Sequence, residues 1–398
     1  MKITKIETVV LEDYPNITFV GVHTDEGLVG WGDTYYMADA VRGYIHGFAA
    51  PMLLGHDPLA IELHWRRLYE VSAHIAGKGA EIRGLSAIDV ALWDILGQAA
   101  GMPVWQLLGG AARDRIKTYN TCGGPTYGRP TRGRSGYGTD RDEPGKYEDL
   151  IGFMTNADEL ASDLLGEGIT GMKIWPFDPF AEASNGTYIS ARDLDTALEP
   201  FRKIRAAVGG DMDIMVEFHS LWNLPTAMRI ARALEEFEPF WFEDPLKADN
   251  IDALATFAAA THVPTTVSET LSTRWSFREV LERRAARVIM LDLSWVGGIS
   301  EAKKIASMAE AYQLPVAPHD CTGPVVLQAS THLSLNAPNA LIQETVRACY
   351  TGWYRELVTN LPVIADGYAA LPALPGLGTE LRPDIPDRPD ATVRVSRG

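Results

Sequence analysis

Hydrophobic and polar positions follow two different patterns along the chain, and the pattern changes near residue 115. Before it, apolar residues alternate along one stretch, and two more extended stretches flank the polar turn Thr24-Asp25-Glu26-Gly27. Three stretches with apolar residues at helical spacing follow. This order predicts a small α+β domain over residues 1–114. The predicted strands are 1–12, 17–23 and 28–32, and the predicted helices are 39–54, 58–73 and 80–100.

Beyond residue 115, short apolar stretches alternate with amphipathic stretches of helical period. Eight such strands separated by helices are typical of a parallel (β/α) barrel, which is an α/β fold. A doubly wound sheet has the same alternation, but no G-x-G-x-x-G follows a predicted strand. The predicted strands are 116–121, 168–175, 212–218, 239–243, 264–269, 287–292, 314–318 and 340–344. The predicted helices include 157–166, 193–208, 225–237, 250–261, 274–285, 299–312 and 324–335.

Two segments depart from this alternation. Residues 122–150 contain seven Gly, four Arg and three Tyr, and they are too many for an ordinary strand–helix connection. The segment is either a surface insertion or a lid, because it leaves the carboxyl end of the first barrel strand, where active sites lie. Residues 369–398 are rich in Pro, and we expect them to return to the N-terminal domain, which leaves 115–368 for the barrel.

Composition limits the partners of the protein. The chain of 398 residues has a net charge of −16 and three cysteines. The acidic balance argues against nucleic acid and anionic membranes as partners, although a bound metal could still attract an acidic small molecule. Three cysteines without metal-type spacing fit a reducing compartment, and no apolar run is long enough for a membrane span. We therefore expect a cytoplasmic protein that acts on a small molecule.

Three carboxylates follow three successive predicted strands of the barrel. Glu217, Glu243 and Glu269 are spaced 26 residues apart, which is about the length of one strand–helix unit. Their charges would meet at one end of the barrel and repel one another unless a cation neutralised them. Carboxylate oxygens completed by water or substrate suit octahedral Mg2+ or Mn2+. The sequence therefore predicts a metal site, with Asp244 beside it rather than among the ligands.

The remaining strand-end residues suggest acid–base chemistry. His319 comes one unit after Asp292, which on the adjacent strand would orient the imidazole and raise its basicity. His219 lies two residues beyond the first carboxylate and so on the same side of the strand, where it could donate a proton to a bound ligand. Lys173 either neutralises the acidic site or stabilises a bound carboxylate, and Glu344 ends the last strand at the same mouth of the barrel.

On these residues the chain resembles the enolase superfamily, mandelate racemase/muconate lactonizing enzyme subgroup, over nearly its whole length. The three carboxylates, the Asp292…His319 pair with Gly297-Gly298 between them, and Glu344 stand in the order typical of the family. Motifs of the N-terminal domain agree. They are Gly30-Trp31-Gly32-Asp33, Ala87-Ile88-Asp89-Val90-Ala91-Leu92-Trp93-Asp94-Ile95-Leu96-Gly97 and Gly101-Met102-Pro103-Val104-Trp105-Gln106-Leu107-Leu108-Gly109-Gly110.

The resemblance implies a (β/α)7β TIM-like barrel with an N-terminal α+β capping domain. It implies removal of the proton α to a carboxylate by His319, with one Mg2+ per site, or Mn2+ in its place, stabilising the enediolate. Lys173 and Glu344 would contact the substrate carboxylate, and Glu344, if protonated, could donate to its oxygen. Members of the family commonly form symmetric assemblies, so we also expect a homo-oligomer.

Two departures from the family pattern narrow the reaction. In Lys173-Ile174-Trp175 an aromatic residue replaces the second lysine that racemases and cycloisomerases usually carry. Glu217-Phe218-His219 resembles the acid-x-His of the sugar-acid dehydratases, the galactonate dehydratases among them, where the histidine protonates the departing hydroxyl. The resemblance therefore favours a hydro-lyase that converts an aldonic or aldaric acid into a 2-keto-3-deoxy acid.

Two alternatives stay open. A racemase, epimerase or cycloisomerase would use the same enediolate, with Lys173 or a tyrosine of the 122–150 segment (Tyr127, Tyr137 or Tyr147) as a second acid or base. The second alternative is a barrel that binds an organic acid without catalysis. Substrate specificity should come from residues 13–18, 33–46 and 122–150 and from Trp222, Trp295 and Trp353.

Overall fold

A four-stranded antiparallel sheet forms the N-terminal part of the computed structural model, which describes residues 1–75, 77–127, 147–370 and 372–398. The strands are ordered β14-β1-β2-β3. The long helix α4 (Ala80–Ala100) packs against β3. The two are so close that a Cβ on Gly32 would lie 2.0 Å from the carbonyl oxygen of Ala87. The strands are β1 (Ile3–Leu11), β2 (Tyr14–Thr24), β3 (Val29–Tyr35) and β14 (Ala391–Arg397).

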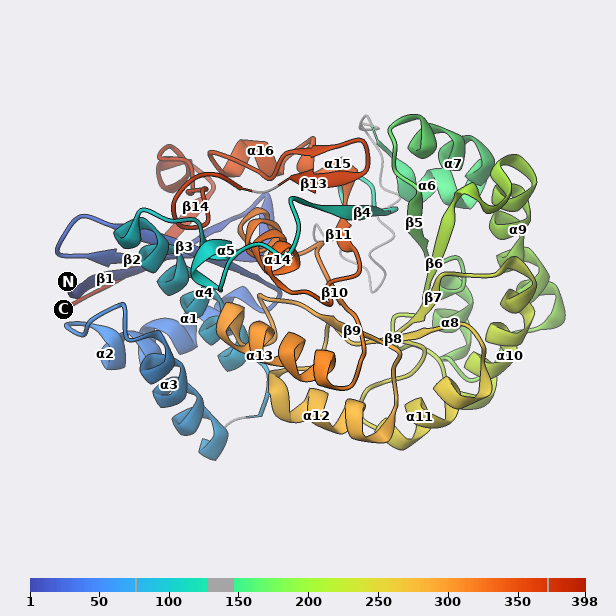
Figure 1. Cartoon of the computed structure of the whole chain (residues 1–398), viewed down its shortest axis with the longest axis horizontal. Helices are drawn as coiled ribbons and strands as arrows, with labels where there is room; N and C mark the ends of the chain where they lie inside the picture. Colours follow the sequence, from blue (N-terminus) through green and yellow to red (C-terminus); the bar gives the residue numbers. More distant parts are fainter. Residues whose placement is uncertain (76, 128–146, 371) are drawn as a thin grey trace.

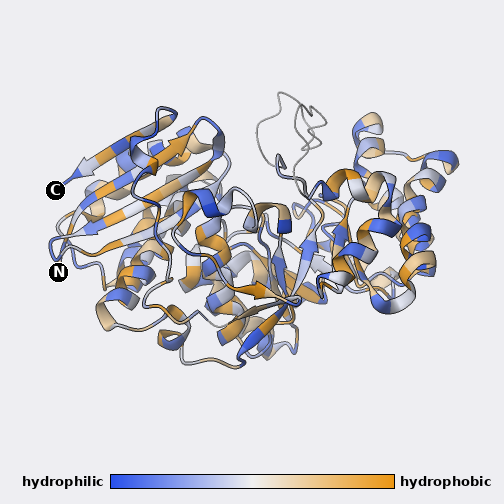
Figure 2. Cartoon of the chain, turned by 90° about the horizontal axis from the view of Figure 1, so that it is seen from above, coloured by the Kyte–Doolittle hydropathy of each residue, from blue (hydrophilic) through white to orange (hydrophobic). Residues whose placement is uncertain are grey.

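The fourth strand of this sheet comes from the other end of the chain. Strand β14 pairs antiparallel with β1 from Lys5↔Arg397 to Leu11↔Ala391. The two termini therefore lie beside each other, at the end of the molecule away from α7 and α9 (Figures 1 and 2). Hydrophilic and hydrophobic residues alternate along the strands of this sheet in Figure 2. The sequence analysis predicted only the first three strands.

One predicted helix of the N-terminal part is divided in the structure. The stretch predicted as one helix, 39–54, consists of two α-helices separated by a π-helical turn, η1. Pro51, near the start of the second helix, has no N–H to continue the regular hydrogen-bond pattern. The helices are α1 (Ala38–Tyr44), η1 (Ile45–Ala49), α2 (Ala50–Leu53), α3 (Ile61–Ile75) and α5 (Val104–Leu107).

Parallel strands of the second part form the predicted barrel. They are hydrogen-bonded in sequence order from β4 to β10, and β11 pairs in parallel with β4. Between β10 and β11, the N–H of Leu341 donates to the oxygen of Val316 at 2.8 Å and closes the barrel. The eight strands in the described residues are β4 (Arg115–Thr121), β5 (Gly171–Ile174), β6 (Asp213–Glu217), β7 (Trp241–Glu243), β8 (Thr265–Val267), β9 (Val288–Leu291), β10 (Val316–Pro318) and β11 (Gln343–Thr345).

Helices follow each of the first seven strands and cover the barrel (Figure 1). The connection of each strand to the next contains one or two of them, so the (β/α)7β prediction is confirmed. They are α6 (Asp149–Thr155), α7 (Ala157–Gly166), α8 (Asp178–Ser184), α9 (Ala191–Val208), α10 (Leu224–Leu234), α11 (Ile251–Ala260), α12 (Thr273–Arg283), α13 (Gly298–Ala311) and α14 (Pro324–Asn336). Short elements complete the chain: η2 (Gly209–Asp211), η3 (Glu235–Phe237), α15 (Arg347–Tyr350), α16 (Tyr354–Leu357), β12 (Ile364–Ala365), β13 (Tyr368–Ala370) and η4 (Ile385–Asp387).

Large apolar side chains fill the inside of the barrel beneath the strand ends. This inner cluster is separate from the larger apolar layer between strands and helices, and it leaves the polar residues at one end above a packed floor. The inner cluster consists of Tyr119, Met215, Trp241, Val288, Met290, Ala317 and Ile342.

Buried carboxylates of the N-terminal motifs fasten this part to the barrel. Asp33 accepts the backbone N–H groups of Val325 and Val326, at 3.0 and 2.9 Å, in the first turn of α14. Asp89 accepts the N–H of Ser300 in the first turn of α13 at 3.0 Å. A carboxylate at a helix N-terminus satisfies free donors and the positive end of the helix dipole. These contacts hold β3 and α4 above the carboxyl ends of the barrel strands.

In the part of the chain that the structure describes, no helix is both long enough and apolar enough to cross a membrane.

Candidate active site

The predicted site residues come together at the carboxyl end of the barrel. Lys173 lies within β5, Glu217 and Glu243 are the last residues of β6 and β7, and Asp292 and His319 directly follow β9 and β10. Most of them line one cavity of about 220 Å³, while Glu243 and Asp292 are fully buried behind its wall. The predicted residues that line it are Lys173, Glu217, His219, Glu269, Trp295, His319 and Glu344.

Lys173 lies at the centre of the carboxylates. Its Nζ is 2.8 Å from Glu344 and 3.6 Å from Glu217, and it also bonds to Glu243. Burial alone would lower the pKa of Lys173, but the charges of Glu243 and Glu344 raise it well above its ordinary value. Lys173 is therefore a fixed cation and not a base at neutral pH.

The surroundings of Glu344 favour its ionised form over the protonated form that the sequence analysis considered. Burial raises its pKa, but Lys173 and His319 counteract this and hold the pKa below the usual range. Thr121 Oγ1 and the N–H of Asp320 both donate to its carboxylate, the latter at 3.0 Å. Glu344 is thus an ionised acceptor that orients Lys173, and donation of a proton to the substrate by this group is not supported.

The three glutamates predicted as metal ligands are buried at or just beyond the ends of three neighbouring strands. Burial and the charge of Glu217 raise the pKa of Glu243 well above its usual range, which marks an excess of negative charge. Oxygen Oε2 of Glu269 is buried and receives no hydrogen bond from a described residue, and the same holds for Oδ1 of Asp244. Within the described ranges, no three His, Cys, Asp or Glu side chains already converge as ligands of one ion.

This donor set nevertheless fits a hard divalent cation. The carboxylates supply oxygen ligands only, and two buried oxygens without a donor are available beside the cavity. A bound cation would offset the charge excess that raises the pKa of Glu243. The residues present are therefore compatible with Mg2+, and the ligand assignment stays a prediction.

His319 and Asp292 form a buried pair on adjacent positions of the barrel. His319 Nδ1 lies 2.7 Å from Asp292 Oδ2. Asp292 is itself fixed by the N–H and hydroxyl of Ser294, at 2.7 and 2.6 Å, and by the hydroxyl of Thr322 at 2.9 Å. With Nδ1 committed to Asp292, Nε2 is the nitrogen left for a ligand in the cavity, and Cys321 Sγ lies 3.4 Å from it. Burial lowers the pKa of His319, but Cys321, Glu344 and the bond to Asp292 raise it well above its ordinary value.

A second imidazole–carboxylate pair was not predicted. His219 Nδ1 lies 2.6 Å from Oδ2 of the buried Asp178, the first residue of α8. Burial would lower the pKa of His219, but Asp178 and Glu217 raise it to about 9. In the sequence, Asp178 looks like any acidic residue in the first turn of a helix, so no signal distinguished it.

Side chains from the capping domain complete the cavity. Tyr35, Tyr36 and Arg83 line it from the end of β3 and from α4, so the 33–46 segment reaches the cavity, and its part in substrate specificity stays a prediction. Among the tryptophans expected to set specificity, Trp295 lines the cavity. Trp353 instead stacks on Tyr14 at 4.5 Å between ring centroids.

Of the other residues expected to set substrate specificity, some line the cavity and some do not. Trp222 is buried, and neither it nor residues 13–18 are among the described residues that line the cavity. From the 122–150 segment, predicted as either a surface insertion or a lid, Tyr127 lines the cavity beside Trp175. Residues 128–146 of that segment, including Tyr137, lie outside the described residues.

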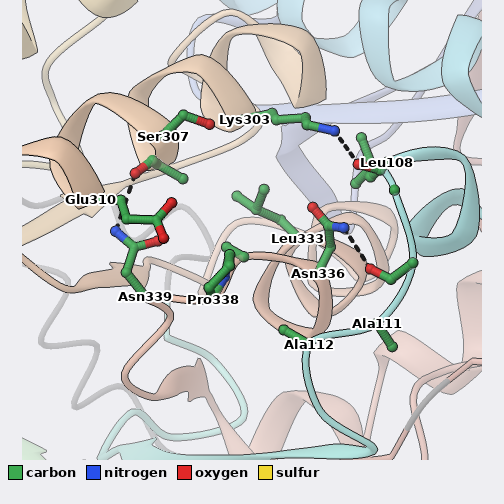
Figure 3. Close-up of a pocket in the computed structure, with 14 residues that line it drawn as sticks. Leu108, Ala111, Ala112, Lys303, Ser307, Glu310, Leu333, Asn336, Pro338 and Asn339 are labelled. Carbon is green, nitrogen blue, oxygen red and sulfur yellow. Dashed lines mark hydrogen bonds between the residues drawn. The ribbon is translucent and has the colours of Figure 1, made fainter.

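A second cavity, of about 330 Å³, lies between the 108–112 loop, α13 and the end of α14 (Figure 3). Its polar side chains bind backbone carbonyls: Lys303 donates to Leu108 and Asn336 to Gly110, the latter at 2.6 Å. These bonds fasten the 108–112 loop to α13 and α14. This cavity contains none of the predicted site residues.

Comparison with protein families identifies the class of protein. Residues 7–109 match the mandelate racemase/muconate lactonizing enzyme N-terminal domain, and residues 156–385 match the enolase C-terminal domain-like family. The chain belongs to the enolase superfamily, in its mandelate racemase/muconate lactonizing enzyme group.

Individual relatives narrow the class further. The chain is 34% identical to a D-galactonate dehydratase of Ralstonia nicotianae over 391 residues, 96% of this chain and 92% of the relative. A D-galactonate dehydratase of Pectobacterium atrosepticum is 33% identical, with 97% and 93% covered. A solved enolase of the mandelate racemase subgroup from Agrobacterium tumefaciens has 51% identity and a TM-score of 0.89, with 100% and 99% covered. The protein is an enzyme of the hydro-lyase class.

Proposed function

We propose that the protein is a Mg2+-dependent acid-sugar dehydratase that forms a 2-keto-3-deoxy acid. The observation that carries the proposal is that two imidazoles, each paired with a buried carboxylate, line the same cavity. His219 follows β6 and His319 follows β10, and these strands are four apart in a barrel of eight, so the histidines stand on opposite sides of the mouth. A substrate between them has one imidazole for its α-proton and another for its β-hydroxyl.

The sequence of proton transfers follows from the two pairs. His319 Nε2 takes the α-proton, and the pair of electrons from that C–H bond forms the carbon–carbon double bond of the enol. His219 gives a proton to the β-hydroxyl, the carbon–oxygen bond breaks, and water leaves. Asp292 and Asp178 hold the two rings and stabilise their charged forms. The enol then tautomerises to the 2-keto-3-deoxy acid.

Removal of a proton from the carbon next to an ionised carboxylate gives an enediolate, and the additional negative charge of this enediolate needs strong stabilisation. Lys173 supplies one positive charge at the substrate carboxylate, and Glu344 orients it. Mg2+, held by Glu217, Glu243 and Glu269, would supply the Lewis acidity that stabilises the enediolate. Mn2+ has the same preference for oxygen ligands and can replace it.

The geometry supports an isomerase less well. Two-base racemisation or epimerisation needs a second group that exchanges protons, and Lys173 is held as a cation by three carboxylates. Trp175, at the position of the missing second lysine, has no exchangeable proton of suitable acidity and packs edge-on against His219, with ring centroids 5.6 Å apart. Tyr127 remains in the cavity, but burial raises the pKa of its phenol well above the ordinary value.

A substrate panel tests the proposal. We expect purified protein with Mg2+ to convert at least one member of a set of aldonates and aldarates into a semicarbazide-reactive keto acid, and EDTA to stop the reaction. Glu269→Gln should abolish turnover and leave the far-ultraviolet circular dichroism unchanged. Solvent deuterium in recovered substrate of inverted configuration, without keto acid, would assign the protein to the isomerases instead. Turnover unaffected by EDTA would refute the metal site.

A further inference from the structure

Arg83 is a cavity residue that the reaction above does not use. It comes from α4 of the capping domain and lines the cavity together with Tyr36 and Trp295. Its guanidinium carbon lies 4.0 Å from the centroid of the Trp295 ring, and Nη1 donates to the backbone oxygen of Tyr35 at 2.8 Å. The stack and the hydrogen bond together fix the plane of the guanidinium.

The charge of Arg83 has no partner among the described residues. Its Nε and Nη2 groups donate to none of them, and no carboxylate of the described chain lies within 4.0 Å of its nitrogens. Burial lowers the pKa of Arg83, while Asp292, Tyr36 and Glu269 raise it from a distance without forming an ion pair. A partly buried cation without a counterion is costly unless a ligand supplies one.

Another buried arginine of this chain shows the contrast. Arg347 donates from Nε and Nη2 to the two oxygens of Asp149, both at 2.7 Å, and its Nη1 pairs with Asp163. In Arg347 the edge formed by Nε and Nη2 is therefore filled by a carboxylate of the protein. In Arg83 no described residue occupies the same edge, although its ring stack and backbone bond resemble those of a structural arginine.

Strand order puts Arg83 across the mouth from Lys173. Lys173 belongs to β5, and Trp295, on which Arg83 stacks, belongs to the turn after β9. These strands are four apart in the barrel of eight, which is the largest separation that the barrel allows. A ligand whose carboxylate lies at Lys173 and whose chain crosses the cavity would bring its far end to Arg83.

We propose that Arg83 binds a second carboxylate at the distal end of the substrate, so that the enzyme acts on a dicarboxylic sugar acid, an aldarate, in preference to an aldonate. The inference rests on the proposed function, because the position of the reacting carboxylate at Lys173 defines which end is distal. The open Nε–Nη2 edge matches the two oxygens of a carboxylate, whereas the terminal hydroxyl of an aldonate offers one acceptor and no charge.

Paired substrates test this proposal. Each aldarate is compared with the aldonate of the same configuration, for example galactarate with galactonate, and kcat/KM is measured for wild type and variants. We expect the aldarate of the best pair to be preferred, and Arg83→Gln to lower its kcat/KM about 10- to 100-fold with little change for the aldonate. Arg83→Lys keeps the positive charge but loses the two parallel N–H donors of the guanidinium. Its kcat/KM for the aldarate should therefore lie between the values of the wild type and of Arg83→Gln.

Lys78→Gln provides a matched control. It removes the same charge five residues earlier, from an exposed side chain that does not line the cavity, and both substrates should keep their wild-type kcat/KM. Two results would overturn the assignment of Arg83: an equal loss of kcat/KM for aldarate and aldonate in Arg83→Gln, or a preference of the wild-type enzyme for aldonates. Either result would leave the dehydratase proposal intact.

A binding measurement separates failure of this inference from failure of the proposed function. Adipate and hexanoate are unreactive six-carbon acids with two carboxylates and one, and their affinities for the Mg2+-loaded protein are measured by calorimetry. We expect adipate to bind about 10-fold or more tightly than hexanoate, and Arg83→Gln to remove the difference. Equal affinities in the wild type would refute a distal carboxylate site even if no sugar acid were turned over.

Discussion

Each histidine of the cavity is oriented by one buried carboxylate. Asp292 lies 2.7 Å from Nδ1 of His319, and Asp178 lies 2.6 Å from Nδ1 of His219. A bond at Nδ1 leaves Nε2 as the reactive nitrogen and stabilises the imidazolium when it forms. A carboxylate bonded to Nδ1 therefore suits a histidine that acts as a base and one that acts as an acid. The position of each ring relative to the substrate decides which of the two roles that histidine has.

The two carboxylates should be separable by substitution. Asp292→Asn should lower both α-proton exchange and dehydration about 10- to 100-fold, because it weakens the base that acts first. Asp178→Asn should lower dehydration by a similar factor and leave exchange near the wild-type rate, because it weakens only the acid. Proton NMR in deuterated buffer measures exchange, and semicarbazide measures the keto acid. Equal effects of Asp178→Asn on both rates would show that Asp178 holds the site together rather than positioning His219.

The sequence predicted residues that follow strands and missed residues that reach the cavity from elsewhere. His319, Asp292 and Glu217 follow apolar strands at regular intervals, so the barrel repeat was sufficient to bring them together. Asp178 and Arg83 come from helices, where an isolated charge looks like a solvated one. Only the packing of α8 and α4 against the barrel brings Asp178 to His219 and Arg83 to the cavity, and no local pattern encodes that packing.

At the level of elements, predictions succeeded where the periodic pattern was long and regular. The stretches 80–100 and 157–166 are α4 and α7 with the same limits. The stretch 39–54 was wrong as a single helix, because hydrophobic spacing does not register the π-helical turn before Pro51. Strand β14 was missed because its seven residues are mostly exposed and its partner β1 lies at the other end of the chain.

The contact of β3 with α4 yields a prediction about stability. Gly32→Ala would bring a Cβ within 2.0 Å of the Ala87 carbonyl oxygen, so strand and helix must separate. We expect a loss of about 1–3 kcal/mol in the free energy of unfolding, measured with urea. Gly43→Ala on α1 is the control, because its Cβ would meet nothing within 4 Å and alanine favours the helix. Equal stability of the two variants would contradict the close approach of α4 to β3.

At the scale of the whole molecule, buried polar groups join segments that are distant in the sequence. His332 on α14 accepts the N–H of Trp105 at Nδ1 and donates from Nε2 to the oxygen of Leu377, both at 3.1 Å. It thus connects the barrel to the α5 segment of the N-terminal part and to the C-terminal segment. Burial lowers the pKa of His332 to about 4, so the folded protein holds it neutral.

This histidine makes stability depend on pH in a defined window. Its pKa is lower in the folded chain than the ordinary 6.5, so its contribution is complete above about pH 6.5 and is lost as the pH falls toward 4. We expect His332→Gln to reduce the loss of unfolding free energy between pH 6.5 and 4.5 by about 2–3 kcal/mol, as measured with urea. His74→Gln, an exposed site on α3, should leave the pH dependence unchanged. If the free energy of unfolding of His332→Gln fell with pH as steeply as that of the wild type, groups other than His332 would cause the loss.

The most direct test of the central proposal is the exchange of the substrate α-proton with deuterated solvent in the two histidine variants. The measurement needs a substrate of the wild-type enzyme, and it follows the α-proton by NMR while keto acid is measured in parallel. His319→Asn should show neither exchange nor dehydration, because the base is missing. His219→Asn should still exchange the α-proton and form no keto acid, because only the acid for the leaving hydroxyl is missing. Dehydration by His219→Asn at the wild-type rate would contradict the division of roles between the two sides of the barrel mouth.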